Sequence, residues 1–372
     1  MKVSMTTQAC RLESIDALRG IAVLLMIQQH VLYWLCSDTK SSKLVLTLSA
    51  MGGLAAPIFV TLAGVGSSLA VQRLSCLDLC MPLRGLILIG FGYLLNFLAP
   101  HWFSLGAWYV LHLIGFAVML SPLLQRISSP YVLGLMFAVI IMTAVLQTYL
   151  NTPFQLYNHQ MGNPSSLWGF FKHMLVEGFF PIFPWVAYFM AGIVSGRWLI
   201  YKKEKKIGYL AIILFGIFIG FMFCNFTNST FTKSEFLIRF FTLTPSFYPS
   251  LTPIILLLMS LSLFSLYGII FIEAKISLRN LRFLSDLGQS SMTLLIVHVA
   301  VIRGAAHYFG FWKIFSVIES ILLTYSVLFV FTVISYQWHN FNFCYGTEWL
   351  LRKVSNKILS VRENCFFSRA AS

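Results

Sequence analysis

The sequence predicts an all-α fold, a polytopic membrane bundle of about ten transmembrane helices with both termini on the cytoplasmic side. Three observations predict it: 58% of the 372 residues are hydrophobic, only 10% are charged, and the mean hydropathy is +0.81. A soluble domain carries about 25% charged residues, so that class is excluded. An outer-membrane barrel would show segments of roughly ten residues with alternating polar and apolar positions, and the sequence contains no such alternation.

The helices are predicted from apolar runs that reach the roughly 20 residues needed to cross a bilayer. Each run ends at a polar break or at one rich in Pro and Gly. The predicted helices cover residues 17–36, 45–71, 84–99, 107–124, 131–150, 181–200, 207–225, 250–272, 290–309 and 314–337.

The orientation is predicted from the basic residues, because inner loops of membrane proteins collect Lys and Arg. With ten spans and the N-terminus inside, 7 of the 26 basic residues fall outside, which leaves 19 inside. The seven outer residues are Lys40, Lys43, Lys172, Lys233, Arg239, Arg303 and Lys313. An odd number of spans would remove this asymmetry. If the chain is bacterial, it is expected in the inner, cytoplasmic membrane.

The domain organisation is read as one integral membrane domain, residues 1–338, followed by a cationic cytoplasmic tail, residues 339–372. The first 16 residues lack a cleavage-type pattern, so we expect the first helix to remain attached. Two long outer loops, residues 151–180 and 226–249, are polar and aromatic and could form the mouth of a substrate site.

The charge and the cysteines exclude two other classes of site. The net charge of +14 would favour nucleic acid as a partner in a soluble chain, but in a membrane protein it reports orientation, so no nucleic-acid partner is predicted. Cys76 and Cys80 stand four residues apart without nearby His or Cys partners, which is not the spacing of a metal site. No metal is predicted.

Ionisable residues within spans are the functional candidates, because a charged side chain costs roughly 2.5 to 3.5 kcal/mol there. In the first helix, Arg19 and His30 are eleven residues apart, about 16 Å along the axis and only about 20° around it. Asp16 can pair with Arg19 three residues later. A cation at the inner end and a titratable base deeper in the bilayer suit a substrate with phosphates at one end. Alternatively, Arg19 anchors the helix at the headgroups and His30 makes a structural hydrogen bond.

The remaining candidates lie on later helices. Arg84 and Asn96 lie on the third helix, His112 on the fourth, and His298 and Arg303 on the ninth. Apolar residues surround His298 and His112, so each could instead be a neutral histidine with a structural hydrogen bond. The pairs Gly192 with Gly196 and Gly216 with Gly220 are typical of close helix packing; all four residues are read as structural.

Several motifs resemble one family. The segment RLESIDALRGIAVLLMIQQH, residues 11–30, resembles the opening of the transmembrane acyltransferase superfamily, and within it the heparan-alpha-glucosaminide N-acetyltransferase family, with Arg19, ten residues and then His30. Further matches are APIFVTLAGVGSSLA from Ala56, RGLILIGFGYLLN from Arg84, FPIFPWVAYFMAGIVSGRWL from Phe180 and LGQSSMTLLIVH from Leu287. YGTEWLLR, from Tyr345, is similar to the tail of a neighbouring bacterial family of uncharacterised membrane proteins.

The resemblance implies transfer of an acyl group, usually acetyl from cytoplasmic acetyl-CoA, to a sugar amine or hydroxyl of a glycan or glycolipid on the other side. Arg19 and Arg84 would bind the donor phosphates, since Arg can grip phosphate with two parallel donors, and Asp16 and Asn96 are assigned to substrate binding. His30 and His298 are the catalytic candidates, with His30 as general base. In the human-type branch the catalytic His lies in the loop after the first helix, whereas residues 37–43 contain none. His30 therefore takes the role from the wider superfamily pattern.

Other readings stay open at this stage. A proton-coupled transporter or flippase would also have spans with buried Arg and His, but it often carries acidic residues at membrane depth, and here nearly every Asp and Glu lies at a span end or in a loop. An inactive acyl-donor or lipid-binding scaffold is the third reading. The bilayer and an acyl-CoA are expected partners, and a homodimer is a further expectation.

Overall fold

The fold of the computed structural model is a bundle of helices, and the part of the chain that the structure describes contains no β-strand. The described residues are 12–39, 42–71, 77–100, 102–156, 161, 164, 166–227, 234–242, 247–276 and 281–354. Among them, eight helices are long and apolar enough to cross a membrane, or nine if the bent pair Leu167–Glu177 and Ile182–Ile200 counts as one span. The all-helical membrane class is confirmed. The number ten and the orientation stay predictions.

The first half of the chain contains six long or apolar helices that follow the predicted order. They are α1 (Glu13–Leu35), α2 (Lys43–Gly52), α3 (Ala55–Val71), α4 (Leu77–Leu98), α5 (Val110–Arg126) and α6 (Ser129–Tyr149). The predicted helix 45–71 is interrupted after Gly52, where the turn at Gly53 and Leu54 separates α2 from α3. The predicted helix 107–124 corresponds to α5, which has 17 residues, fewer than the roughly 20 that cross a bilayer.

The second half contains the short α8 (Leu167–Lys172), the π-helical turn η1 (His173–Glu177), α9 (Ile182–Ile200) and α10 (Lys205–Thr227). The short α11 (Glu235–Phe241), α12 (Thr252–Glu273) and α13 (Arg282–Gln289) follow. The predicted ninth helix is α14 (Ser291–Val297), the π-helical turn η4 (His298–Arg303) and α15 (Gly304–Tyr308) in continuous succession, and α16 (Val317–His339) is the last long helix. The sequence did not predict α8, α11 and α13, because they are too short to span.

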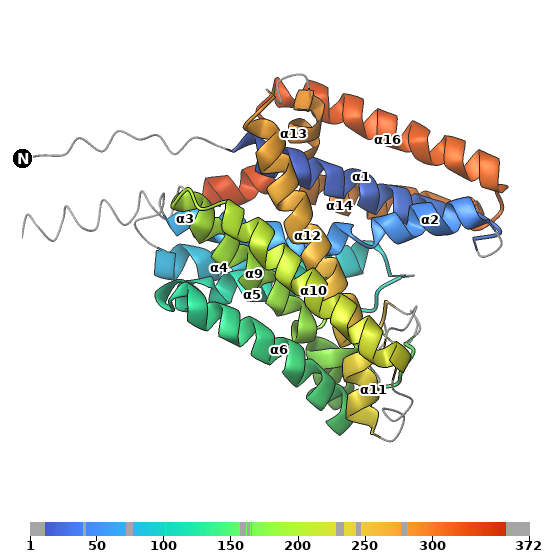
Figure 1. Ribbon diagram of the computed structural model, residues 1–372. Coiled ribbons are helices and arrows are strands. Elements are labelled where there is room, and N and C mark those ends of the chain that lie inside the picture. The colour runs from blue at the N-terminus through green and yellow to red at the C-terminus, as the bar shows by residue number, and fades with distance from the viewer. Residues whose placement is uncertain are drawn as a thin grey trace, which may run out of the picture.

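The centre of the bundle is α1, which packs against α2, α3, α12, α13 and α16 (Figure 1). It is so closely packed on α13 that a Cβ at Gly20 would lie 1.9 Å from the carbonyl oxygen of Leu284. The predicted glycine contact of α9 is confirmed, since a Cβ at Gly192 would lie 2.0 Å from the carbonyl oxygen of Thr61 on α3. Gly216 and Gly220 on α10 have no comparable neighbour, so the predicted packing there is wrong within this chain.

The segment after α16 contacts the start of α14. Residues 347–354 are helical, and Glu348 Oε1 accepts hydrogen bonds from the backbone N–H groups of Met292 at 2.6 Å and Thr293 at 3.2 Å. Glu348 Oε2 accepts a third, at 2.6 Å, from the Thr293 hydroxyl. A carboxylate at a helix N-terminus satisfies N–H groups that have no partner within the helix. Glu348 therefore caps the helix that leads to His298.

Candidate active site

A cavity of about 700 Å³ lies where several helix ends meet. Its walls come from the C-terminal part of α1, the α2–α3 turn, the loop after α4, the start of α5, and the residues just before α9 and α12. The polar lining side chains are Gln29, His30, Tyr33, Ser49, Tyr109 and Tyr248. Most of the remaining wall is aromatic or aliphatic, with Trp102, Phe179, Phe180 and Phe247 among its residues. A largely apolar cavity with a few convergent polar groups is the usual form of a small-molecule site.

Two histidines that are far apart in the sequence meet at the wall of this cavity. Nδ1 of His30 on α1 lies 2.9 Å from Nε2 of His298 on η4. The rings stack, with centroids 5.2 Å apart and an interplanar angle of 12°. His30 lines the cavity, whereas His298 is completely buried behind it. The structure therefore joins the two catalytic candidates in one pair.

The hydrogen bonds of this pair fix which nitrogen can act as a base. Nδ1 of His298 lies 2.8 Å from the carbonyl oxygen of Leu294, and a carbonyl only accepts, so this nitrogen carries hydrogen. In neutral His298 the other nitrogen, Nε2, then accepts from Nδ1–H of His30. Nε2 of His30 is left with a lone pair, and none of the described residues hydrogen-bonds it. The arrangement can remove a proton from a molecule in the cavity.

Aromatic rings hold the His30 imidazole in place. It stacks on Trp34 with a centroid distance of 5.4 Å and meets the ring of Trp102 edge-on at 5.3 Å. Gly52 lets the end of α2 approach on this side, because a Cβ there would lie 2.3 Å from the Cβ of Gln29. These contacts restrict the ring to the orientation in which it reaches His298.

Arg303 stands behind the same rings. Its guanidinium carbon lies 4.9 Å from the ring centroid of Trp102, 4.5 Å from that of Trp312 and 5.9 Å from that of Trp34. Residues five apart point about 140° away from each other on an α-helix, but a π-helical turn closes between residues i and i+5. The turn η4 therefore brings Arg303 toward the face that carries His298. The sequence marks both residues as ionisable but does not predict the π-helical turn that brings them together.

The donor-binding candidates lie away from the cavity wall. Arg19 pairs with Asp16 at 3.2 Å, as predicted from their spacing, and its side chain is 27% exposed. Arg84 lies half-buried on α4. Asn96 is buried and donates a hydrogen bond to the carbonyl oxygen of Ala107 at 2.9 Å, so it supports the loop that carries Trp102 into the cavity. None of these four residues lines the cavity.

His112 has a structural partner. Its Nδ1 accepts a hydrogen bond from the backbone N–H of Tyr109 at 3.1 Å, and its ring meets Tyr93 and packs against Trp108 at centroid distances of 4.5 and 5.5 Å. It is buried outside the cavity.

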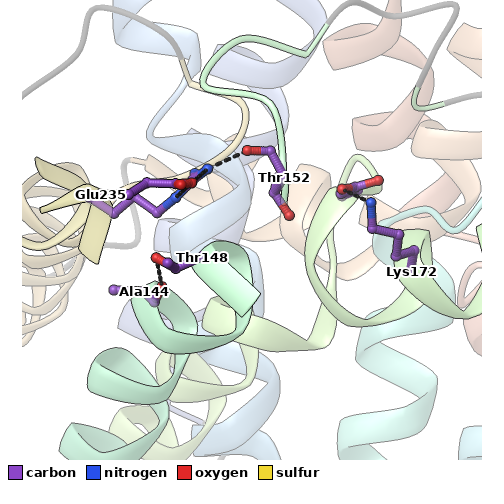
Figure 2. A network of polar contacts seen from close by, with 7 residues as sticks. Ala144, Thr148, Thr152, Lys172 and Glu235 are labelled. Atoms are coloured by element: carbon purple, nitrogen blue, oxygen red, sulfur yellow. Dashed lines mark hydrogen bonds and ion pairs between the residues drawn. The ribbon is translucent and has the colours of Figure 1, made fainter. Parts of the chain in front are cut away.

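The two long loops contribute aromatic residues to the cavity, and their polar residues form contacts within each loop and between the two loops. Arg239 pairs with Glu235 at 2.6 Å and donates to the carbonyl oxygen of Thr152 (Figure 2). Lys172 pairs with Glu177 at 2.8 Å. The backbone N–H of Leu156 donates to the carbonyl oxygen of Tyr248 at 3.2 Å and so joins one loop to the other. His159, a titratable residue of the first loop, lies outside the described residues.

The side chains that could ligate a metal ion do not form a cluster among the described residues. Within the described ranges, no three His, Cys, Asp or Glu side chains are grouped so that they could hold a metal ion. Cys80 is buried, and Cys76 lies outside those ranges.

Comparison with known protein families gives a match that covers the N-terminal part of the site. The family model described as heparan-alpha-glucosaminide N-acetyltransferase, catalytic, matches residues 11–211, which is 201 of 372 residues. The matched part contains His30, Trp102 and Tyr109, and His298 lies beyond it. No curated protein matches the chain. The family match confirms the resemblance predicted from the sequence.

Proposed function

Because this chain belongs to the heparan-alpha-glucosaminide N-acetyltransferase family, we propose that it transfers an acetyl group from acetyl-CoA to an amine or hydroxyl of a glycan or glycolipid. The observation that carries the proposal is the His30–His298 pair at the wall of the aromatic cavity. Aromatic walls suit a sugar, whose apolar C–H faces can lie against rings while a few polar side chains orient it.

The chemistry follows from the tautomers of the pair. Nε2 of His30 takes the proton of the acceptor amine or hydroxyl while that group attacks the thioester carbonyl carbon. The carbon–sulfur bond breaks, and the CoA thiolate takes the proton from His30 as it leaves. His298 accepts the Nδ1–H of His30 throughout, so it orients the base and stabilises the imidazolium that forms. A covalent variant is also consistent with the pair: Nε2 of His30 attacks the thioester carbon, the carbon–sulfur bond breaks, and CoA leaves as the thiolate. The acceptor then takes the acetyl group from the acyl-imidazolium, which restores neutral His30, and the proton of the acceptor goes to the thiolate.

The two substrates are proposed to enter from opposite sides. With the N-terminus inside, the cavity lies at the outer end of α1, which suits an extracytoplasmic acceptor. Arg19, about 16 Å from His30 along the helix, lies at the inner end and would bind donor phosphates together with Arg84. Asp16 fixes the direction of Arg19, and Asn96 supports the loop around Trp102. In a bacterial cell the protein would occupy the inner membrane, with residues 339–372 as a cytoplasmic tail and a homodimer as the expected assembly.

Purified protein tests the function directly. Labelled acetyl-CoA is mixed with a glucosamine-terminated oligosaccharide, and transfer of label is measured for the wild type and for His30→Ala. We expect turnover in His30→Ala to fall by about 10² or more, with donor binding retained. Rapid mixing without an acceptor separates the two routes, because label retained on the protein requires acetyl-His30. Wild-type turnover in both His30→Ala and His298→Ala would contradict acyl transfer at this site.

A further inference from the structure

Tyr109 is a buried residue of the cavity wall, and the proposed acyl transfer does not use its hydroxyl. Tyr109 stands at the start of α5, and its ring packs between Phe103 at a centroid distance of 4.5 Å and Phe180 at 5.5 Å. Only 4% of the residue is exposed. These contacts hold the ring rigidly, so they also fix the direction of its hydroxyl.

No group in the described ranges receives a hydrogen bond from this hydroxyl. Buried hydroxyls in proteins nearly always have a hydrogen-bond partner, and a buried tyrosine usually finds one for its O–H. Tyr109 lines the cavity, so the cavity is where a partner can approach. A molecule bound there would complete the hydrogen bond.

A second phenol lies close to the first. Tyr248, which precedes α12, lines the same cavity, and both tyrosines contact Phe179, at 6.3 Å for Tyr109 and 6.0 Å for Tyr248. Burial raises the pKa of Tyr248, and the neighbouring phenol of Tyr109 raises it further. Tyr248 therefore keeps its proton at every physiological pH, so its hydroxyl, like that of Tyr109, remains able to donate a hydrogen bond.

The base and Tyr109 are separated by one residue of the wall. The ring of Trp102 lies 5.3 Å from that of His30 and 6.4 Å from that of Tyr109. A molecule between them can meet both at once, with its reacting group at His30 and a different polar group at Tyr109. Two fixed points orient a bound ring far better than one does.

We propose that Tyr109 determines acceptor specificity by donating a hydrogen bond to a sugar oxygen other than the group that His30 deprotonates. This role rests on the proposed acetyl transfer to a glycan. The ligand is a hydroxyl-bearing sugar ring, because a phenol O–H can donate to a sugar hydroxyl or to the ring oxygen.

Tyr109→Phe tests this role because it removes the oxygen and leaves the ring contacts with Phe103 and Phe180 in place. With methyl glucosaminide as acceptor, we expect KM for the sugar to rise about three- to tenfold, the effect of one hydrogen bond, and kcat at saturating sugar to fall by a smaller factor. Tyr188→Phe is the matched control: Tyr188 is fully buried, but its hydroxyl donates to the carbonyl oxygen of Ile255 at 3.1 Å, outside the cavity. It should keep the wild-type KM.

Deoxy analogues of methyl glucosaminide identify the oxygen. The analogue that lacks the partner of Tyr109 should have the same KM with the wild type and with Tyr109→Phe, and the other analogues should keep the difference. Equal KM for every analogue in the two proteins overturns the role, and so does a rise in KM for acetyl-CoA as large as the rise for the sugar, which would assign the hydroxyl to the donor.

The outcome for the proposed function is separate. If the wild type transfers no acetyl group, the proposed function is wrong. Binding of the same sugars then tests Tyr109, and it is measured by tryptophan fluorescence, to which Trp102 in the cavity wall contributes. Quenching that saturates at three- to tenfold lower sugar concentration in the wild type than in Tyr109→Phe supports the role. Identical curves, or no quenching in either protein, overturn it.

Discussion

Nδ1 of His30 and Nε2 of His298 lie 2.9 Å apart although 268 residues separate them in the chain. Nδ1–H of His298 donates to the carbonyl oxygen of Leu294. Nε2 of His298 must therefore accept from Nδ1–H of His30, so both hydrogen bonds of the pair have a fixed direction of donation. The order resembles that of a catalytic triad, in which a second group fixes the tautomer of the base, with a neutral imidazole in the place of the carboxylate. The predictions below test the pair, the residues around it and its orientation in the membrane.

The first prediction concerns the acceptor atom of His298. His298→Ala should lower turnover by about 10² or more, because His30 loses the partner that fixes its tautomer. In His298→Gln the side-chain amide oxygen can take the place of Nε2, so we expect this variant to retain more turnover than His298→Ala. Labelled acetyl transfer at equal amounts of monodisperse protein measures both. Equal turnover in the two variants would show that the hydrogen bond to His30 does not contribute to turnover.

Arg303 is predicted to hold the tryptophans around His30. Arg303→Ala should lower stability by about 1–2 kcal/mol, the value of a desolvated cation–π contact, and should shift tryptophan fluorescence. Arg303→Lys keeps the charge but loses the planar stacking, so its melting temperature and turnover should fall between those of Ala and wild type. Lys313→Met is the control, since Lys313 lies 4.8 Å from the ring of Tyr33 alone. A fluorescence shift as large in Lys313→Met as in Arg303→Ala contradicts a special role for Arg303.

Glu348 is predicted to support the site from outside it. Glu348→Ala should cost about 1–2 kcal/mol, as loss of a helix cap does, and should lower turnover because the start of α14 frays next to His298. Glu319 makes the matched control: it caps the N-terminus of α16 by accepting from Ser316 N–H at 2.8 Å, on a helix without a catalytic candidate. Glu319→Ala should lower the melting temperature and leave turnover unchanged. Turnover lost equally in both variants would reduce the role of Glu348 to general stability.

Arg19 is predicted to bind the donor. Arg19→Ala should weaken acetyl-CoA binding more than sugar binding, because a bidentate phosphate contact is lost, and Arg19→Lys should restore it only in part. Isothermal titration of each purified variant with CoA and with methyl glucosaminide separates the two effects. Unchanged CoA affinity in Arg19→Ala removes Arg19 from the donor site.

The orientation follows from the distribution of basic residues. In a cysteine-free background, a single cysteine at Gln155 should react with an impermeant thiol reagent on intact cells, whereas one at Lys203 should react only after lysis. Both positions are exposed, so burial does not limit either reaction. The reverse pattern would place the cavity on the cytoplasmic side.

The sequence predicted those parts of the site that depend on one helix. Eleven residues place Arg19 and His30 on one face of α1, and three residues pair Asp16 with Arg19, as the structure confirms. It also identified His298 as a candidate. It could not predict that His298 meets His30, because periodicity gives the buried face of a helix but not its neighbour. The sequence did not predict a role in the site for Trp102 or Tyr109. They lie in and after a short loop, where aromatic residues have no distinctive spacing.

The same limit explains the fold differences. Hydropathy predicted the apolar runs, but it treats 45–71 as one helix, since the Gly52–Gly53 pair is not polar. It cannot distinguish an α-helical from a π-helical turn at His298–Arg303 either, because the hydropathy of a segment does not depend on the number of residues per turn. Gly216 and Gly220 show the opposite error: their spacing is typical of packing, yet no atom of the described residues lies within 4 Å of a Cβ placed at either position.

The long separation of the two histidines also determines when the pair can form. His30 leaves the ribosome with the first helix, whereas His298 follows 268 positions later, and Glu348, which caps the helix that leads to His298, follows only after α16. Since membrane helices emerge from the N-terminus onward, a nascent chain carries His30 for most of synthesis without the group that orients it. A chain truncated before His298 therefore has no partner for Nδ1 of His30 there, and the acetyl transfer proposed above would begin only after His298 has been translated.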